Sequence, residues 1–120
     1  MPWSVILLDA VEDWFPELAR EDAGSAYLVA AAIDKLEQEG PTLGRPLVDR
    51  VKASRYHHMK ESRPGSSGRS EVRVLFAFDP DQQAILLVAG DKSGDWRGWY
   101  PANIKVADDR YDEWLRKGRT

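Results

Sequence analysis

An alternating run of apolar residues, followed by a turn and a second apolar run, constrains the fold of this chain most strongly. In residues 70–78, Val or Phe recurs at alternate positions, and Arg73 and Leu75 fall between them. A period of two is typical of a strand whose two faces differ. Residues 79–82 can form a turn, and residues 84–89 carry the apolar sequence AILLVA. We therefore predict an antiparallel hairpin with one largely apolar face.

The N-terminal third of the chain predicts a strand and a helical hairpin. Residues 3–9 are apolar and β-branched enough for a buried strand. Apolar side chains recur at helical spacing in residues 11–18, where Pro16 is compatible only with a first turn or a kink. A longer helix is predicted from about Asp22 to Gly40, because glycine supplies a left-handed cap.

The remaining segments complete one small domain over residues 1–120. Residues 41–53 are irregular, residues 56–63 can be extended, and the PGSSG sequence at 64–68 is a loop. Pro101 can begin the last helix, whose apolar residues share one face. The predicted fold class is α+β: an antiparallel sheet with an N-terminal helical hairpin on one face and a C-terminal helix.

Charge is distributed unevenly along the chain. The formal net charge is −3 at pH 7, but residues 44–73 hold eight Lys or Arg against three acidic residues. Residues 1–43 hold two basic and nine acidic residues. A basic stripe in an acidic chain predicts a polyanionic partner at one surface. Because binding to bare duplex needs many net positive contacts, we expect any contact with nucleic acid to be local.

Cysteine is absent from the sequence, which excludes disulfides, a thiolate metal site and a cysteine nucleophile. This composition fits a reducing compartment, so a cytoplasmic protein is expected. The longest apolar runs, at residues 5–8 and 30–33, are far shorter than a membrane span. The N-terminus also lacks the pattern of a signal peptide, and no membrane partner is predicted.

Period-two geometry groups several charged residues on one face of the predicted sheet. Glu61 and Arg63 share a face of their strand, whereas Lys60 points the other way unless a bulge intervenes. Arg73 joins them from the neighbouring strand. This group predicts a shallow polar cleft rather than an apolar ligand pocket. The alternative for Arg73 is a surface ion pair, which is the commoner fate of a strand arginine beside acids.

The polar cleft has the groups needed to cleave RNA through its own 2′-hydroxyl. That reaction needs a base, stabilisation of the charged phosphorane and protonation of the leaving 5′-oxygen. Glu61 or a lysine of lowered pKa is the candidate base. Arg63 and Arg73 can hold the phosphate, and Lys92 or Tyr100 can protonate the leaving group. This chemistry requires no metal ion and no cofactor.

Cationic and aromatic residues around the cleft are candidate RNA contacts: Arg55, His57, Lys60, Arg69, Trp96 and Trp99. The two tryptophans can stack on unpaired bases, as in other readers of single-stranded RNA. The alternative is that they anchor a loop by packing. His57 and His58 are adjacent and lack a well-spaced carboxylate, so no metal site is predicted.

The motifs MKESR, VRVLFAFDP, AILLV followed by GDK, and ADDRY occur in an order that resembles the HigB-like, phage-related branch of the RelE/ParE toxin superfamily. The resemblance spans nearly the whole chain, and Glu61, Arg63, Arg73 and Lys92 match its pattern. The chain departs from that pattern in several ways. Ser62 replaces an apolar residue, one lysine stands where two are common, and no histidine occurs near the C-terminus. The net charge is acidic, and GDWRGWYP forms an unusual insertion.

The resemblance implies a type II toxin that cuts mRNA on the ribosome and is silenced by a helix-turn-helix antitoxin. Operator DNA would then be contacted only through the antitoxin complex. Two alternatives stay open: an inhibitor of the ParE kind that binds gyrase without catalysis, and an attenuated relic that only binds its antitoxin.

Overall fold

The computed structural model describes residues 3–65 and 68–117, and its centre is a five-stranded sheet. The strands are β1 (Ser4–Leu7), β2 (Val48–Arg50), β3 (Lys60–Ser62), β4 (Val72–Phe78) and β5 (Gln83–Asp91). Their order across the sheet is β1-β5-β4-β3-β2. Every neighbouring pair is antiparallel except β1 and β5, which run parallel. The α+β class is confirmed, and the parallel edge strand is an addition to the antiparallel sheet that the sequence predicted.

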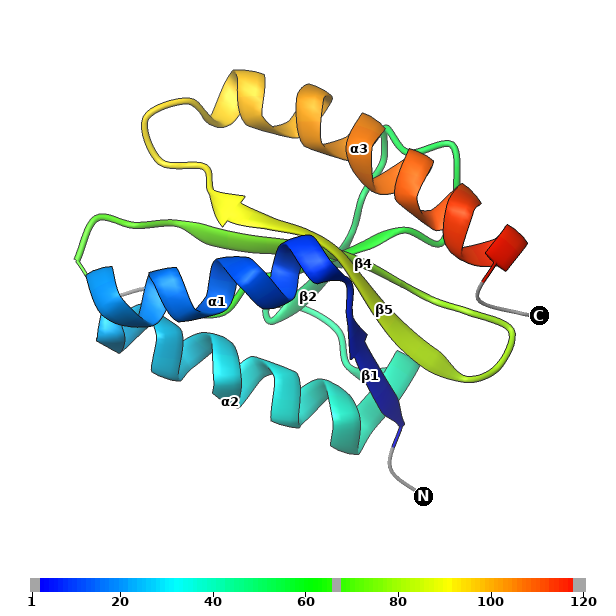
Figure 1. The fold of residues 1–120 in the computed structure, drawn as a ribbon, viewed down its shortest axis with the longest axis horizontal. Helices are drawn as coiled ribbons and strands as arrows, with labels where there is room; N and C mark the ends of the chain where they lie inside the picture. The colour runs from blue at the N-terminus through cyan, green and yellow to red at the C-terminus, as the bar shows by residue number, and fades with distance from the viewer. Residues whose placement is uncertain (1–2, 66–67, 118–120) are drawn as a thin grey trace.

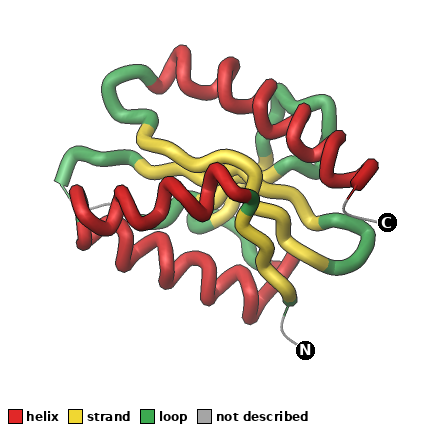
Figure 2. The backbone as a smooth tube through the Cα atoms, in the orientation of Figure 1, coloured by secondary structure: helices red, strands yellow, loops and turns green. Residues whose placement is uncertain are grey.

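Helices cover both faces of this sheet (Figures 1 and 2). Helices α1 (Asp9–Glu21) and α2 (Ala23–Glu39) lie on one face, and α3 (Trp96–Lys117) lies on the other. One core cluster joins Val11 of α1 and Leu36 of α2 to the sheet, and a second joins Ile104 and Tyr111 of α3 to it. Among the helices in the described ranges, none is both long and apolar enough to cross a membrane.

The central hairpin has the facing that its alternation predicts. Leu75 and Ala77 belong to the cluster under α3, whereas Val74 and Phe76 belong to the cluster under α1 and α2. Strands β4 and β5 pair with Arg73 opposite Gly90, and their register shifts once between Leu75 and Phe76. The side-chain order along β4 therefore places Arg73 on the α3 face.

Helix α2 begins and ends close to the predicted residues, although Gly40 has a positive φ without the ψ of a left-handed cap. The Asp22 side chain caps the helix by accepting a 3.1 Å hydrogen bond from the Ser25 N–H. Gly40 ends the helix with φ of 58°, a conformation that favours glycine. The Trp3 indole also fills the space where a Cβ at Gly40 would lie. Glycine is therefore required at this position for two independent reasons.

Several predicted boundaries are wrong. Residues 56–59 form turns rather than a strand, so β3 is only three residues long. The segment predicted to be irregular contains β2, which is held by its ladder with β3. Pro101 lies inside α3 rather than at its start, because the Trp99 N–H already bonds the Asp95 carbonyl at 2.8 Å. Pro16 likewise lies inside α1, where it cannot donate a backbone hydrogen bond.

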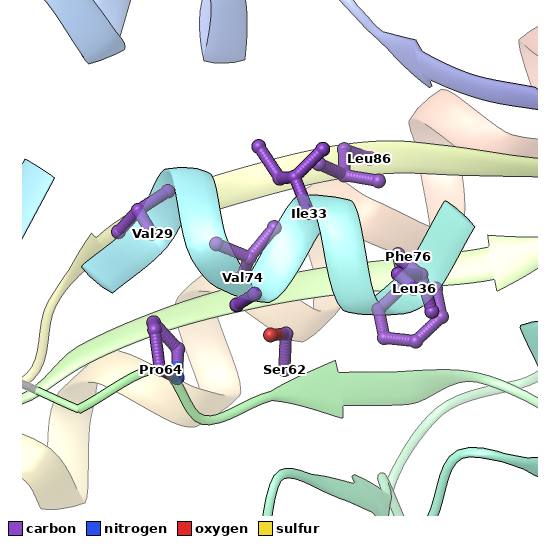
Figure 3. Close-up of a pocket in the computed structure, with 9 residues that line it drawn as sticks. Val29, Ile33, Leu36, Ser62, Pro64, Val74, Phe76 and Leu86 are labelled. Atoms are coloured by element: carbon purple, nitrogen blue, oxygen red, sulfur yellow. The ribbon is translucent and has the colours of Figure 1, made fainter. Parts of the chain in front are cut away.

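Ser62 of β3 lies on the face that α2 covers (Figure 3). With Val29, Ile33 and Val74, it lines a small apolar cavity of about 10 Å³. The position is buried and its neighbours are aliphatic. Ser62 thus stands where the toxin pattern has an apolar residue, and it lies in the core under α2. Glu61 lies on the opposite face of the sheet.

Candidate active site

The strand register brings Glu61 and Arg73 to the same face of the sheet. Glu61 pairs with Leu75 of β4 and with Asp49 of β2 across the ladder. Leu75 packs in the cluster beneath α3. Residues opposite one another in a ladder share a face, as do alternate residues of one strand. Glu61, Asp49 and Arg73 thus all face the side of the sheet that α3 covers.

Glu61 is the buried centre of a charged group on β3 and β2. Its side chain is 5% exposed, and its Oε1 accepts a 2.8 Å hydrogen bond from the Arg63 Nε. Its Oε2 is also buried, and it has no hydrogen-bond partner among the described residues. The Arg63 Nη2 lies 3.3 Å from the Asp49 Oδ2. The hydrogen bond to Glu61 is the main reason that the pKa of Arg63 is raised above its usual value.

Tyr100, in the first two turns of α3, connects this group to the neighbouring strands. Burial and then the nearby Glu61 carboxylate raise the pKa of the Tyr100 phenol, and the Arg73 guanidinium partly opposes the rise. The Lys92 Nζ lies 5.7 Å from the centroid of the Tyr100 ring. Tyr100 is therefore the side chain near which groups from β3, β4 and the end of β5 converge.

Arg73 and Lys92 supply the other two positive charges. The Arg73 Nη1 donates a 2.9 Å hydrogen bond to the Val72 carbonyl, and its buried Nε has no partner in the described part of the chain. The Lys92 Nζ lies 3.6 Å from Glu71 Oε1, and the Lys92 side chain is only 14% exposed. Within residues 3–65 and 68–117, Arg73 forms no ion pair with a carboxylate. The surface ion pair considered for Arg73 is therefore not what the described residues form.

The structure thus gathers all five residues predicted from sequence to form the catalytic cluster: Glu61, Arg63, Arg73, Lys92 and Tyr100. Trp99 borders this cluster. Its ring lies 5.2 Å from the Tyr100 ring in an edge-to-face arrangement. A Cβ placed on Gly90 would lie 3.0 Å from the Trp99 Nε1, so Trp99 packs directly over the residue opposite Arg73. Trp99 is anchored by packing, and it is half-buried at the edge of the cluster.

Comparison with known proteins places this chain in a family. Residues 14–112 match the family described as phage-derived protein Gp49-like. The chain belongs to this family. It is 54% identical over 112 residues to the candidate toxin HigB3 of Mycobacterium tuberculosis, which covers 93% of each chain. It is 55% identical over 108 residues to the candidate toxin HigB2 of the same organism, covering 90% of this chain but 52% of HigB2. The chain thus spans about half the length of HigB2.

A solved structure agrees with this assignment at the level of fold. A mutant of the E. coli toxin RelE in its free state superposes with a TM-score of 0.57, covering 80% of this chain and 90% of that one. The two sequences are 8% identical, so this likeness concerns the fold alone. The family match and the relatives together identify a HigB-like protein, and its fold resembles that of RelE.

Arg55, which the sequence predicts to contact RNA, forms ion pairs within the protein. The Arg55 guanidinium is ion-paired with Asp109 and Asp112 of α3. Its backbone N–H donates a 2.9 Å hydrogen bond to Asp108. These contacts fasten the turn before β3 to the middle of α3. The positive charge of Arg55 is thereby compensated within the protein, although the side chain remains half-exposed.

The other predicted RNA contacts are scattered. His57 is exposed and lies against the His58 ring, with centroids 5.6 Å apart. Lys60 pairs with Phe76 in the ladder, and strand alternation places it on the face opposite to Glu61. Arg69 is exposed in the turn before β4. Trp96 begins α3, and its side chain lies outside the part of the chain that the structure describes.

Two carboxylates of the site were missed from sequence: Asp49 and Glu71, which pair with Arg63 and Lys92. Asp49 lies on a strand too short to be predicted. Glu71 precedes Arg73 by two residues, so period-two spacing carried a usable signal for it. These pairs show that much of the local positive charge counted in the sequence is compensated in the fold. No group of three metal-ligating side chains occurs in residues 3–65 and 68–117.

Proposed function

We propose that this HigB-like protein is the toxin of a type II toxin-antitoxin system and that it cleaves mRNA on the ribosome. The observation that carries the proposal is the meeting of Arg63, Arg73 and Lys92 around the Tyr100 phenol, beside one buried carboxylate. The toxin names of two relatives, HigB3 and HigB2, support the toxin part. The nuclease part rests on the chemistry of the cluster.

Each step of the cleavage has a group in the cluster. Attack by the ribose 2′-hydroxyl builds negative charge on the phosphate, and Arg73 and Lys92 can stabilise that charge. The Tyr100 phenol is protonated at neutral pH, as an ordinary tyrosine is, and it can donate a proton to the leaving 5′-oxygen, which is a stronger base than the phenolate. Glu61 and Lys92 are the two candidates for the base. The reaction needs no metal ion, because guanidinium and ammonium groups provide the electrostatic stabilisation.

The proposed partners follow from the same assignment. A cognate antitoxin of the helix-turn-helix class would bind and silence the protein, and operator DNA would be reached only through that complex. The ribosome would present mRNA in an extended form to the cluster, with Trp99 at its edge. The proposed reaction takes place in the cytoplasm, where ribosomes translate.

Inducible expression of the wild-type protein, Arg73→Ala and Lys92→Ala tests the proposal. Arg116→Ala is the matched control, because Arg116 is exposed in the last turn of α3. We expect wild-type and control proteins to arrest growth and to cut transcripts at positions within codons. Each active-site variant should lose cleavage by about 100-fold or more, the usual cost of removing one such charge-stabilising donor.

Two readouts separate this proposal from its alternatives. Mapping the 5′ ends of transcripts, with and without translating ribosomes, reports cleavage directly. Plasmid supercoiling reports inhibition of gyrase. Intact transcripts together with altered supercoiling would show that the protein inhibits gyrase and does not cleave mRNA. Equal growth and unchanged mRNA in all cultures would leave only an antitoxin-binding relic.

A further inference from the structure

We infer that Glu61 is a positioning residue rather than the proton acceptor, and that it acts with Asp49 to hold Arg63 while orienting the Tyr100 hydroxyl. This inference rests on the proposed nuclease function and deepens it. It assigns Asp49, a residue of the short strand β2, to the site. It also leaves Arg73, Lys92 and Tyr100 as the groups that face the substrate.

The burial of Glu61 is the first argument. The residue is 4% exposed, one carboxylate oxygen is engaged by Arg63, and the other has no measurable contact with solvent. A general base must come within about 2.6–3.2 Å of the hydroxyl that it deprotonates, or reach it through one water. A ribose would have to displace Arg63 to approach Oε1 so closely, and Oε2 is buried.

The geometry of Arg63 is the second argument. Its guanidinium bonds the Glu61 Oε1 at 2.8 Å and lies 3.3 Å from the Asp49 Oδ2. Asp49 and Glu61 are opposite one another in the β2–β3 ladder, so the two carboxylates stand side by side. The fork of a guanidinium can engage two such acceptors at once. Arg63 is therefore fixed in place by two anions, whereas Arg73 forms no ion pair in the described residues.

The surroundings of Tyr100 are the third argument. The Glu61 carboxylate contributes to raising the pKa of the Tyr100 phenol, and the Arg73 guanidinium on the adjacent strand opposes the rise. The unpartnered Glu61 Oε2 is an acceptor, and the phenol is a donor. A carboxylate that fixes the direction of a phenol O–H presents the phenol oxygen in one orientation. Glu61 thus acts on the reaction through Tyr100 and Arg63.

Conservative variants separate positioning from proton transfer. In Glu61→Gln the amide oxygen can still accept from Arg63, which also keeps Asp49. We expect kcat to fall by no more than about tenfold, with both limbs of the pH profile retained. Loss of a general base would instead lower kcat by about 100-fold to 10,000-fold and remove one limb of the pH profile. Asp49→Asn alone should lower kcat by about threefold or less, because Glu61 still binds Arg63.

The double variant Glu61→Gln/Asp49→Asn provides a second test. Arg63 then has no carboxylate partner, so the loss in kcat should exceed the product of the two single losses. Independent, multiplicative losses would overturn the inference. Circular dichroism and urea unfolding of every variant establish that each one is folded before its rate is compared.

A titration without RNA tests the orientation of Tyr100 even if the protein cleaves nothing. Nuclear magnetic resonance of ¹³Cζ-labelled tyrosines should show that the pKa of Tyr100 falls in Glu61→Gln, since the carboxylate contributes to raising it. Tyr27, which is 75% exposed, is the internal control, and its pKa should be the same in both proteins. If the pKa of Tyr100 falls in Glu61→Gln but the protein has no nuclease activity, the proposed function is wrong and the influence of Glu61 on Tyr100 is supported. An unshifted Tyr100, or a pH limb lost in Glu61→Gln, would overturn the inference.

Discussion

The carboxylate of Glu61 and the guanidinium of Arg63 are joined by a 2.8 Å hydrogen bond on the face of the sheet beneath α3. This bond connects the buried interior to the half-exposed edge of the site, because Glu61 is inaccessible and Arg63 is 36% exposed. The stability of the protein and the arrangement of its proposed active site therefore depend on the same pair.

Arg63→Ala should destabilise the protein by about 2 kcal/mol, because Glu61 is left buried without its donor. Urea unfolding at neutral pH measures this change. Arg69→Ala is the control, since Arg69 is exposed in a turn, and it should stay within about 0.5 kcal/mol of wild type. An equal effect of the two substitutions would show that Glu61 does not depend on Arg63.

Asp79 should stabilise the protein at neutral pH, and this stabilisation should be lost in acid. Burial alone would raise the pKa of this carboxyl, but hydrogen bonds from Trp114, Gln83 and Asp81 outweigh burial and lower it. A lowered folded pKa contributes stability above the unfolded value, and that stability is lost as pH falls through the folded pKa. The contribution should therefore be complete at neutral pH and decline below about pH 4.

Asp79→Asn tests this prediction by urea unfolding at pH 7 and pH 3. We expect a loss of about 1–2 kcal/mol at pH 7, because an amide replaces a carboxylate that accepts four hydrogen bonds. The difference from wild type should shrink at pH 3. A difference that is the same at both pH values would mean that the charge of Asp79 is not responsible.

Ser62→Val should stabilise the protein by about 1 kcal/mol, the usual gain from filling a small apolar cavity. The Ser62 side chain lies among aliphatic residues beneath α2 (Figure 3), and the added methyl groups would replace a hydroxyl there. Thermal unfolding measures the gain. Ser62→Thr is the matched comparison, because it adds one methyl group and keeps the hydroxyl, and it should gain less. A lower melting temperature for both variants would show that the cavity is too small to accept them.

Gly90→Ala should reduce mRNA cleavage without unfolding the protein. The new Cβ would lie 3.0 Å from the Trp99 Nε1, so Trp99 must shift. Tyr100 is adjacent in sequence and packs against the Trp99 ring, and its position should change as well. We expect activity to fall by about tenfold, since small displacements of positioned groups are costly. Gly44→Ala is the control, because no atom lies within 4 Å of a Cβ built there.

Much of the fold was predictable because its signals are local. The alternation in β4 sets which side chains face α3, and Asp22 and Gly40 mark the ends of α2. Local signals did not predict a strand that is very short or a helix that begins among residues typical of loops. Strand β2 has three residues and exists through its pairing with β3. The start of α3 was also misplaced: Gly98 and the polar residues around it favour a loop, yet Trp99 packs over Gly90 and the helix begins before Pro101.

The sequence by itself determined that Glu61 and Arg63 share a face, because strand alternation fixes the direction of each side chain relative to its neighbours. The register between β3 and β4 then brings Arg73 to the same face. Only the tertiary structure decided which charges meet. Asp49 pairs with Arg63, Glu71 pairs with Lys92, and Arg55 pairs with α3. Ion pairs such as Arg55 with Asp112 join residues far apart in the chain. No local pattern encodes them, because the packing of α3 on the sheet sets the distance between the partners.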